Sequence, residues 1–371
     1  INAMAYNDNR GLVDEFGGIK DLKDGIIRCV GDAGQRFDED ALRMLRAVRF
    51  AGQLGFAIEE KTREAIVERA DHLKNISAER IRVELTKLLV SKEAGRIRDA
   101  YKTGMTKYFL PELDAAMQTE QKNPHHIYTV GEHSICGIEL MNCFFGITSD
   151  KKIYDKIPEN VLETAKKLAA KMDKKQQTVL CMTMLLHDIA KPAVMTVDEK
   201  GIGHFIGHPA QSEKMAKKIM RRLTFDNDSI SKACRLIRFH DYRMEDKSRA
   251  FRRAVSKIGA DIMDMLFLVE YADVLAQSDM QRDEKLAKID AGVKRFEYIM
   301  ANAQPLSIKD LAVTGSDLIA AGVKPGPKMG EILKAMLDKV LDEPELNTKD
   351  GLLNYLKCEK GNKNVEENED L

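Results

Sequence analysis

Residues 36–50, which read RFDEDALRMLRAVRF, decide how the fold and the function of this chain are interpreted. From Asp40 onward every third residue is charged: Asp40, Arg43, Arg46 and Arg49. On a helix this spacing forms one slowly drifting stripe, opposite an apolar side of leucine and valine. A row of guanidinium groups can hold phosphates, and an aspartate beside an arginine matches the Watson–Crick edge of a base. The alternative is a solvated helix face with ion pairs between residues three apart.

The composition is that of an ordinary globular protein. The 371 residues are 44% hydrophobic and 32% charged, which suits about two or three domains. The 59 Lys and Arg residues are balanced by 59 Asp and Glu residues, so a protein that coats nucleic acid through bulk positive charge is excluded. No apolar run has the length of a membrane span. The six cysteines are dispersed without a Cys-x-x-Cys pair, which favours reduced thiols and a cytoplasmic location.

The spacing of apolar residues predicts a mainly α-helical chain. Residues 1–31 are rich in glycine and predict a small β part with short strands and turns. Asp38 is the expected N-cap of the helix that carries the charged stripe. Thr62, Ser77 and Ser91 are candidate starts of the helices that follow. Amphipathic helices are also expected near residues 131–145, 177–190, 209–223, 229–240 and 260–277.

A second group of polar residues falls in this helical middle. Its members are of the metal-ligand type: His133, His187, Asp188, His208, His240 and Asp273. Residues 184–192 read MLLHDIAKP, and a polar pair inside an apolar helix is costly to bury unless it is satisfied. Imidazole and carboxylate together suit Mn, Fe, Ni or Zn. For any one of these histidines the alternative is a hydrogen-bonded core or surface residue.

Other polar residues near this group are interpreted separately. Lys191 lies four residues after His187 and shares its helix face, either to bind phosphate or as an ordinary charge at a helix end. His125 and His126, next to Pro124, are out of helical register with the group. We therefore expect these two histidines at the surface.

Residues 36–50 resemble the EDxxR motif and the following arginines of the class II tRNA nucleotidyltransferases, which include CCA-adding enzymes and bacterial poly(A) polymerases. Four further stretches resemble parts of that family in the same order: residues 1–7, 12–22, 79–85 and 311–353. In this family the motif, here with Glu39 before Asp40, binds nucleotide. The resemblance implies that Asp40 and Arg43 pair with the base of CTP or ATP. It also implies that Arg46 and Arg49 reach the phosphates or orient the first pair.

The same resemblance implies an order of domains. The expected parts are a remnant of the nucleotidyltransferase head (1–31), a neck for base recognition and tRNA binding (32–117), an HD domain (118–304), a helical tail (305–358) and a disordered end (359–371). The family's head carries a glycine-rich loop and a DxD pair that binds Mg²⁺, and neither is found before residue 36. We therefore expect the Mg²⁺ ligands to be missing and this chain to be inactive in nucleotidyl transfer as it stands.

The predicted neck is also the expected site of contact with the tRNA acceptor arm. Residues 36–109 contain 16 Lys and Arg residues against 12 Asp and Glu residues. Such a basic surface suits the phosphates of RNA. The alternative for any one lysine is an ordinary solvated helix surface.

The order His, His-Asp, Asp resembles the HD phosphohydrolase superfamily. The resemblance implies that His133, His187, Asp188 and Asp273 hold a divalent transition metal. His208 and His240 match the extra histidines of members that hold two metals. Asp188 and Lys191 would then serve a phosphodiesterase or phosphatase reaction on tRNA ends. The alternatives are a free-standing HD nucleotide phosphohydrolase, a poly(A) polymerase of the same family, and a tRNA-binding module without catalysis.

Overall fold

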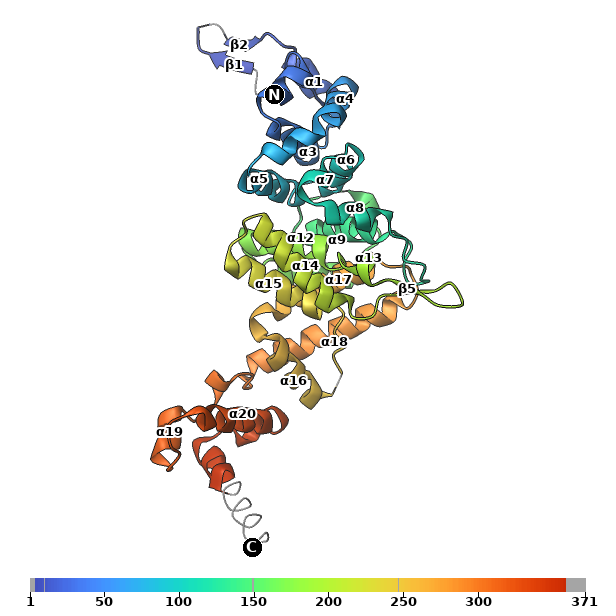
Figure 1. The fold of residues 1–371 in the computed structure, drawn as a ribbon. Helices are drawn as coiled ribbons and strands as arrows, with labels where there is room; N and C mark the ends of the chain where they lie inside the picture. Colours follow the sequence, from blue (N-terminus) through green and yellow to red (C-terminus); the bar gives the residue numbers. More distant parts are fainter. Residues whose placement is uncertain (1–3, 10, 149, 246, 358–371) are drawn as a thin grey trace. The chain divides into compact units, whose positions relative to one another are not determined.

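The computed structural model describes residues 4–9, 11–148, 150–245 and 247–357, and helices make up most of them (Figure 1). The prediction of a mainly α-helical chain is therefore confirmed. The chain forms two compact units: residues 1–241 with 264–289, and residues 242–263 with 290–371. The expected domain boundaries at residues 31, 117 and 304 stay a prediction. No helix in the described part of the chain is long and apolar enough to cross a membrane.

The first residues form the expected small β part, together with a helix that was not expected. Strands β1 (Met4–Asn7) and β2 (Gly11–Asp14) pair antiparallel. Helix α1 (Gly18–Asp24) follows, because the Asp14 carboxylate accepts the backbone N–H groups of Gly18 and Ile19 at 2.7 and 2.8 Å. Two short strands, β3 (Ile26–Ile27) and β4 (Ala57–Ile58), then pair in parallel.

Residues 36–50 lie in two helices, whereas one helix was predicted. Helix α2 (Ala33–Glu39) has Asp32 as its N-cap, so the prediction that Asp38 caps a helix is wrong. Helix α3 (Leu42–Leu54) begins after Asp40, whose backbone is extended at φ −154°. The Asp40 carboxylate accepts the Leu42 N–H at 3.2 Å, a local bond that helps to start α3. Asp40 therefore lies between the helices and does not share a helix with the arginines.

The rest of the neck is helical. Ser77 is the N-cap of α5, as expected, whereas Thr62 lies inside α4 and Ser91 precedes a short 3₁₀ turn. The elements are α4 (Glu60–Arg69), η1 (Ala70–Asn75), α5 (Ala78–Leu89), η2 (Ala94–Arg96), α6 (Ile97–Lys102), α7 (Thr106–Phe109) and α8 (Pro111–Gln118).

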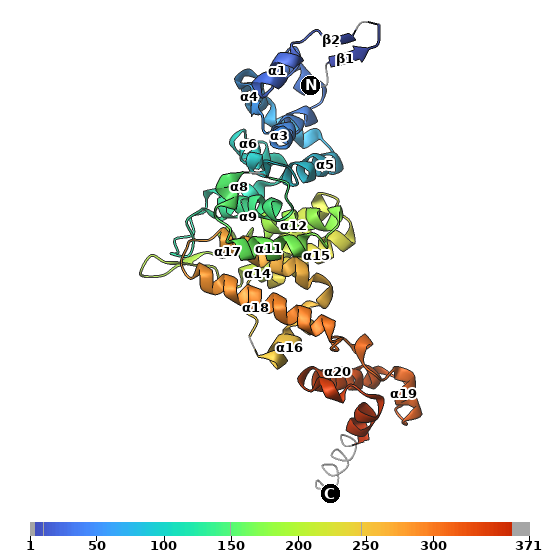
Figure 2. The same cartoon turned by 180° about the vertical axis from the view of Figure 1, so that it is seen from behind.

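The middle of the first unit is a bundle in which α9 packs on α8 and α12, while α15 packs on α12 and α14 (Figure 2). The predicted helices appear within a few residues of their expected bounds. The elements are α9 (Val130–Phe144), α10 (Lys151–Tyr154), α11 (Glu159–Ala169), α12 (Lys174–Leu186), α13 (Lys191–Val194), α14 (His208–Arg222), α15 (Asn227–Phe239) and α17 (Met263–Leu275). An antiparallel hairpin of β5 (Thr196–Val197) and β6 (Gly203–His204) separates α13 from α14. The pair His187-Asp188 follows the end of α12 rather than lying inside it.

The second unit has its own apolar core, which includes Leu318, Met336 and Leu352. Arg252 of α16 is buried and donates to the carbonyl oxygens of Leu341 and Asp342 at the end of α20. The elements are α16 (Ser248–Ile258), η3 (Ala260–Ile262), α18 (Arg282–Ala301, shared between the units), η4 (Ile308–Asp310), α19 (Gly315–Ala320), α20 (Pro327–Asp342) and η5 (Pro344–Leu346). The expected disordered end at 359–371 lies outside the described residues.

Candidate functional site

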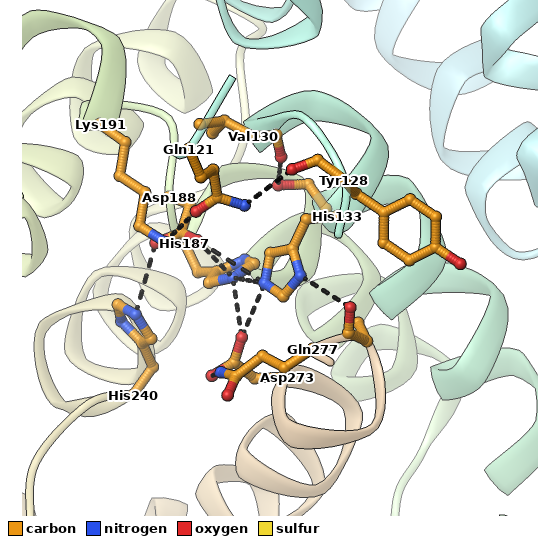
Figure 3. A network of polar contacts seen from close by, with 12 residues as sticks. Gln121, Tyr128, Val130, His133, His187, Asp188, Lys191, His240, Asp273 and Gln277 are labelled. Carbon is orange, nitrogen blue, oxygen red and sulfur yellow. Dashed lines mark hydrogen bonds and ion pairs between the residues drawn. The ribbon is translucent and has the colours of Figure 1, made fainter. Parts of the chain in front are cut away.

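All six predicted metal ligands meet at one buried centre in the first unit. Figure 3 shows five of them, His133, His187, Asp188, His240 and Asp273. They come from different elements: His133 from α9, His187 and Asp188 from the end of α12, His208 from the start of α14, His240 from the end of α15, and Asp273 from α17. Four of them are buried, and the side chains of His208 and Asp273 are only slightly exposed. We call these six residues the histidine–aspartate centre.

Each of the four histidines is fixed by a backbone carbonyl. The Nδ1 atoms lie 2.8 to 3.3 Å from carbonyl oxygens, in the pairs His133–Ala276, His187–Met184, His208–Phe205 and His240–Ile237. A carbonyl oxygen can only accept, so each Nδ1 carries the donated proton. In its neutral form each ring then has an Nε2 lone pair for a metal ion, which is the arrangement that metal-binding histidines adopt.

These Nε2 atoms converge in two pairs. The Nε2 atoms of His133 and His187 are 3.3 Å apart, and those of His208 and His240 are 3.4 Å apart. Asp188 lies between the pairs. Its Oδ2 is 3.3 Å from the Nε2 of His187, and its Oδ1 is 3.3 Å from the Nε2 of His208. One carboxylate thus faces both pairs, one oxygen to each.

Asp273 completes the first pair. Its Oδ1 lies 2.8 Å from the Nε2 of His133 and 3.5 Å from that of His187. Its Oδ2 accepts from the Gln277 side chain at 3.0 Å, which orients the carboxylate. Sequence reasoning missed Gln277, although its position four residues after Asp273 on the same chain segment was a usable signal.

The electrostatics of the centre favour positive charge between its ligands. Burial opposes a charged ring, yet the carboxylates of Asp188 and Asp273 raise the pKa of His187 to about 10. Burial would raise the pKa of Asp188, but Lys191 and His187 hold it well below its ordinary value. The buried Oδ1 of Asp188 has no hydrogen-bond partner among the described residues. Converging nitrogen donors around two carboxylates, with one oxygen unpartnered, fit a pair of divalent cations.

Lys191 is buried at the start of α13 and contacts the centre directly. Its Nζ lies 2.7 Å from Asp188 Oδ2 and donates to Gln121 Oε1 at 2.8 Å. Gln121 in turn donates to the Tyr128 carbonyl at 3.3 Å. Sequence reasoning missed Gln121, because an isolated glutamine carries no motif.

His126 is not the surface residue that was expected. It is half-buried, and its ring meets the ring of His133 edge to face, with 5.4 Å between the centroids. Burial, then the charge of Lys191, lowers the pKa of His126 to about 3. His125 is also half-buried. The expectation is therefore wrong for both residues.

A second candidate site lies around Asp40. Here a cavity of about 510 Å³ opens between the β3 strand and helices α2 and α3. Its lining includes the predicted Asp40, Arg43 and Arg46, together with Arg36 and Phe50. We call this cavity the arginine pocket. Glu39 is not among its lining residues, but it forms ion pairs with Arg36 and Arg43.

Two of these side chains are held by neighbours. Asp40 Oδ2 accepts from Arg80 at 2.8 Å, across from α5. Arg43 donates to the Arg36 carbonyl at 2.9 Å as well as to Glu39. Asp40 and Arg43 are therefore each held by an ion pair with a residue outside the pocket lining, Arg80 and Glu39 respectively.

Arg49 does not belong to the exposed stripe that was predicted. It is buried, forms an ion pair with Glu84 and lies over the Phe50 ring at 3.8 Å from the centroid. It is not among the residues that line the arginine pocket. The stripe is divided at two points. Asp40 precedes α3, and Arg49, six residues after Arg43, lies roughly 120° around the helix from it and faces Glu84 of α5.

Two protein-family models match separate parts of the chain. The model described as the probable RNA and SrmB-binding site of polymerase A matches residues 55–117. The model described as tRNA nucleotidyltransferase domain 2, putative, matches residues 196–356.

Individual proteins show the same similarity. The CCA-adding enzyme of Bacillus licheniformis is 50% identical over 115 residues, which are 31% of this chain and 29% of that protein. The CCA-adding enzyme of Leuconostoc mesenteroides is 46% identical over 111 residues, or 30% and 28% of the two chains. The chain thus matches less than a third of the length of these curated relatives. The A-adding tRNA nucleotidyltransferase of Deinococcus radiodurans is 28% identical over 354 residues, which are 91% of this chain and 72% of that protein.

Solved structures extend the similarity to the fold. The crystal structure of the Bacillus stearothermophilus CCA-adding enzyme in complex with CTP matches with a TM-score of 0.56 and 22% identity, over 99% of this chain and 73% of that one. A complex of a CCA-adding enzyme with ATP matches with a TM-score of 0.54 and 21% identity, over 96% and 68% of the two chains. The chain is therefore similar in sequence to tRNA nucleotidyltransferases and shares the fold of CCA-adding enzymes.

Proposed function

We propose that this chain belongs to the class II tRNA nucleotidyltransferases and serves the addition of CCA to tRNA 3′ ends from CTP and ATP. The observation that carries the proposal is the arginine pocket, whose lining includes both Asp40 and Arg43. The similarity to CCA-adding and A-adding enzymes along the neck and the C-terminal part supports it. The same similarity favours this function over a free-standing phosphohydrolase, which would leave the neck without a role. Addition of poly(A) by the same residues remains the alternative within the family.

Base recognition follows from the chemistry of the two side chains. Cytosine and adenine both carry an exocyclic amino group beside a ring nitrogen that accepts a hydrogen bond. The Asp40 carboxylate would accept from the amino group, and the Arg43 guanidinium would donate to the ring nitrogen. Uracil and guanine carry a carbonyl oxygen where the amino group stands, and a carboxylate repels it. Arg46 would then face the triphosphate.

The residues of the arginine pocket would bind the nucleotide but would not carry out nucleotidyl transfer. Nucleotidyl transfer uses Mg²⁺ held by carboxylates. Among the described residues, clusters of three or more possible metal ligands occur at the histidine–aspartate centre, and the arginine pocket does not fit Mg²⁺. The proposal for this chain is therefore recognition of the nucleotide and, through the basic neck, of the tRNA acceptor arm.

Binding of CTP and ATP tests this proposal. We expect Asp40→Ala and Arg43→Ala to weaken both nucleotides by about tenfold or more, since each removes a charged hydrogen-bond partner. Lys20→Ala is the control, because Lys20 is exposed, pairs with Asp24 and does not line the pocket. UTP should bind the wild type weakly. Unchanged CTP affinity in both pocket variants would contradict base recognition.

We propose a second activity, metal-dependent hydrolysis of phosphate esters, at the histidine–aspartate centre. The observation that favours it is the convergence of two pairs of Nε2 atoms on one carboxylate. His133, His187 and Asp273 would hold one ion, His208 and His240 the other, and Asp188 would face both. Divalent transition metals such as Mn, Fe, Ni or Zn would supply Lewis-acid chemistry there. The Lys191 ammonium would neutralise charge on the phosphate. Asp188 would fix the two pairs of histidines relative to each other, because one of its oxygens faces each pair.

The substrate class that suits both sites is a tRNA end that carries a 2′,3′-cyclic or terminal phosphate. Metal analysis and hydrolysis of a 2′,3′-cyclic nucleotide test the activity. We expect His187→Ala to lose metal and hydrolysis, while His204→Ala, which changes an exposed histidine paired with Asp198, keeps both. A wild-type protein without metal and without hydrolysis would refute this second activity.

A cytoplasmic location also stays a prediction.

A further inference from the structure

The segment between α8 and α9, residues 119–129, is tied to the histidine–aspartate centre along its length. We call it the site loop. Its two ends form a β-bridge between Glu120 and Thr129. Its middle is held by Ser278, whose backbone N–H donates to the His125 carbonyl and whose hydroxyl donates to the Pro124 carbonyl, both at 2.9 Å. Ser278 lies only five residues beyond Asp273, so the loop is fixed to the segment that supplies a candidate metal ligand.

The β5–β6 hairpin holds the loop from another direction. The Gly203 N–H donates to the Lys122 carbonyl at 2.9 Å. A Cβ atom on Gly203 would stand 2.3 Å from the Gln121 carbonyl oxygen, so the two backbones are in close contact. Gln121 itself is buried and bonded to Lys191. With this many attachments the loop is a rigid support for the side chains that it carries.

His126 is the side chain that this support presents to the centre. Its backbone N–H closes a turn on the Asn123 carbonyl at 3.0 Å, and its ring lies edge to face on His133. His126 thus contacts the histidine–aspartate centre through the ring of His133, and it is not part of either group of possible metal ligands among the described residues.

The hydrogen bonding of His126 also differs from that of the four cluster histidines. Each of those has its Nδ1 bonded to a backbone carbonyl. The buried Nδ1 atoms of His126 and of its neighbour His125 have no hydrogen-bond partner among the described residues, and of the two it is the His126 ring that contacts His133. A buried polar atom without a partner costs free energy and calls for an explanation. Without a fixed Nδ1 bond, the ring can donate from either nitrogen. That property suits contact with a bound molecule better than ligation of a metal ion.

We propose that His126 is a substrate-positioning residue that donates a hydrogen bond to a phosphate oxygen bound at the histidine–aspartate centre, in addition to the charge supplied by Lys191. The proposal rests on the phosphohydrolase function proposed above and names its ligand class, a phosphate monoester or a cyclic phosphodiester. In this proposal the contacts of the site loop fix the position of the His126 imidazole.

The test measures binding of inorganic phosphate to the Mn²⁺-loaded protein by calorimetry, beside kcat and KM for a 2′,3′-cyclic nucleotide. We expect His126→Ala to keep its Mn²⁺ stoichiometry and Tm but to bind phosphate about tenfold more weakly, as loss of one hydrogen bond to a charged group implies. KM should rise by a similar factor. His126→Asn, which keeps a donor, should recover part of the phosphate affinity. His125→Ala is the matched control, because it removes the neighbouring imidazole of the same loop, and it should bind phosphate as the wild type does.

Each other outcome is decisive. Unchanged phosphate affinity in His126→Ala would overturn the proposal, and so would loss of Mn²⁺, which would make His126 a ligand or a structural residue. A wild-type protein that binds Mn²⁺ and phosphate but hydrolyses nothing would refute the hydrolase function, while the phosphate measurement would still decide the role of His126. A loaded wild-type protein that binds no phosphate would overturn the inference.

Discussion

The Nε2 atoms of His133 and His187 lie 3.3 Å apart, and both rings have their Nδ1 within hydrogen-bond distance of a backbone carbonyl. Two such nitrogens can stay this close only if a proton or a cation stands between or beside them. The neighbouring carboxylates raise the pKa of His187 against the effect of burial, so the protein itself stabilises positive charge at this point. A divalent cation bound here would be stabilised by the same carboxylates, and more strongly than a proton because it carries more charge.

Added metal should therefore stabilise the fold. At a Mn²⁺ concentration of about 100 times its Kd, one site gives about 2.7 kcal/mol of added stability. We expect a rise in Tm of several degrees for the wild type and for the His204→Ala control, and none for His187→Ala. Thermal unfolding with and without Mn²⁺ checks this. A full Tm rise in His187→Ala would show that the metal binds elsewhere.

The six residues that the sequence grouped together do lie close together, and their role as metal ligands stays a prediction. The grouping was possible because these residue types are rare in apolar segments. A histidine or an aspartate amid leucines, as at His187 and Asp188, has few structural reasons to exist. The helices that carry these residues show a strong apolar period, and their bounds were expected within a few residues. Assembly of all six residues followed from packing those helices by their apolar faces.

Other features depended on contacts between distant residues. No glycine or proline marks the break at Asp40, and two further aspartates nearby compete as helix caps. Arg49 meets a carboxylate 35 residues away, and a pattern of arginines gives no sign of that partner. His126 is drawn to the centre by a loop that Ser278 holds from more than 150 positions along the chain. Local spacing therefore predicted surface positions for residues that long-range contacts bury.

The ion pair between Asp40 and Arg80 should support nucleotide binding. Arg80 holds one carboxylate oxygen of Asp40 from α5 while the Leu42 N–H holds the other. We expect Arg80→Ala to weaken CTP binding by up to about fivefold with unchanged Tm, because a half-exposed ion pair contributes at most about 1 kcal/mol. Titration with CTP measures this, with Lys20→Ala as control. Tighter binding would mean that Arg80 competes with the base for Asp40 instead of orienting its carboxylate.

Asp226 should make stability depend on pH. It caps α15 by accepting the Ser229 N–H at 3.1 Å, and bonds from Ser229 and Lys175 hold the pKa of its carboxyl below the ordinary value. Since the folded-state pKa lies below the unfolded one, the stabilisation is complete above about pH 4 and is lost as the pH falls toward the folded pKa.

We expect Asp226→Ala to lower the free energy of unfolding by about 1 kcal/mol at pH 7, because it removes the cap, with the difference shrinking below about pH 4. Asp228→Ala is the matched control, because Asp228 also pairs with Lys175 but caps nothing. Urea unfolding at pH 7 and pH 3 distinguishes the two. Equal losses in both variants would assign the effect to surface charge alone.

The buried pair of Arg49 and Glu84 separates a structural role from a nucleotide-binding role. Both side chains are buried, and removal of one partner leaves the other charge without compensation. Glu84→Ala should therefore destabilise the fold by about 3 kcal/mol. The double variant Arg49→Met/Glu84→Leu removes both charges and keeps the volume, so its stability should return close to that of the wild type.

Nucleotide binding by the double variant then decides what Arg49 does. Because Arg49 is turned toward α5 and does not line the arginine pocket, we expect the folded double variant to bind CTP as the wild type does. Urea unfolding and CTP titration on the same preparation give both answers. A stable double variant that no longer binds CTP would mean that Arg49 leaves Glu84 to reach the phosphates, as the resemblance to the EDxxR motif implied. In that case the ion pair would be the resting state of a nucleotide-binding arginine, and stability alone would not explain why this arginine is buried.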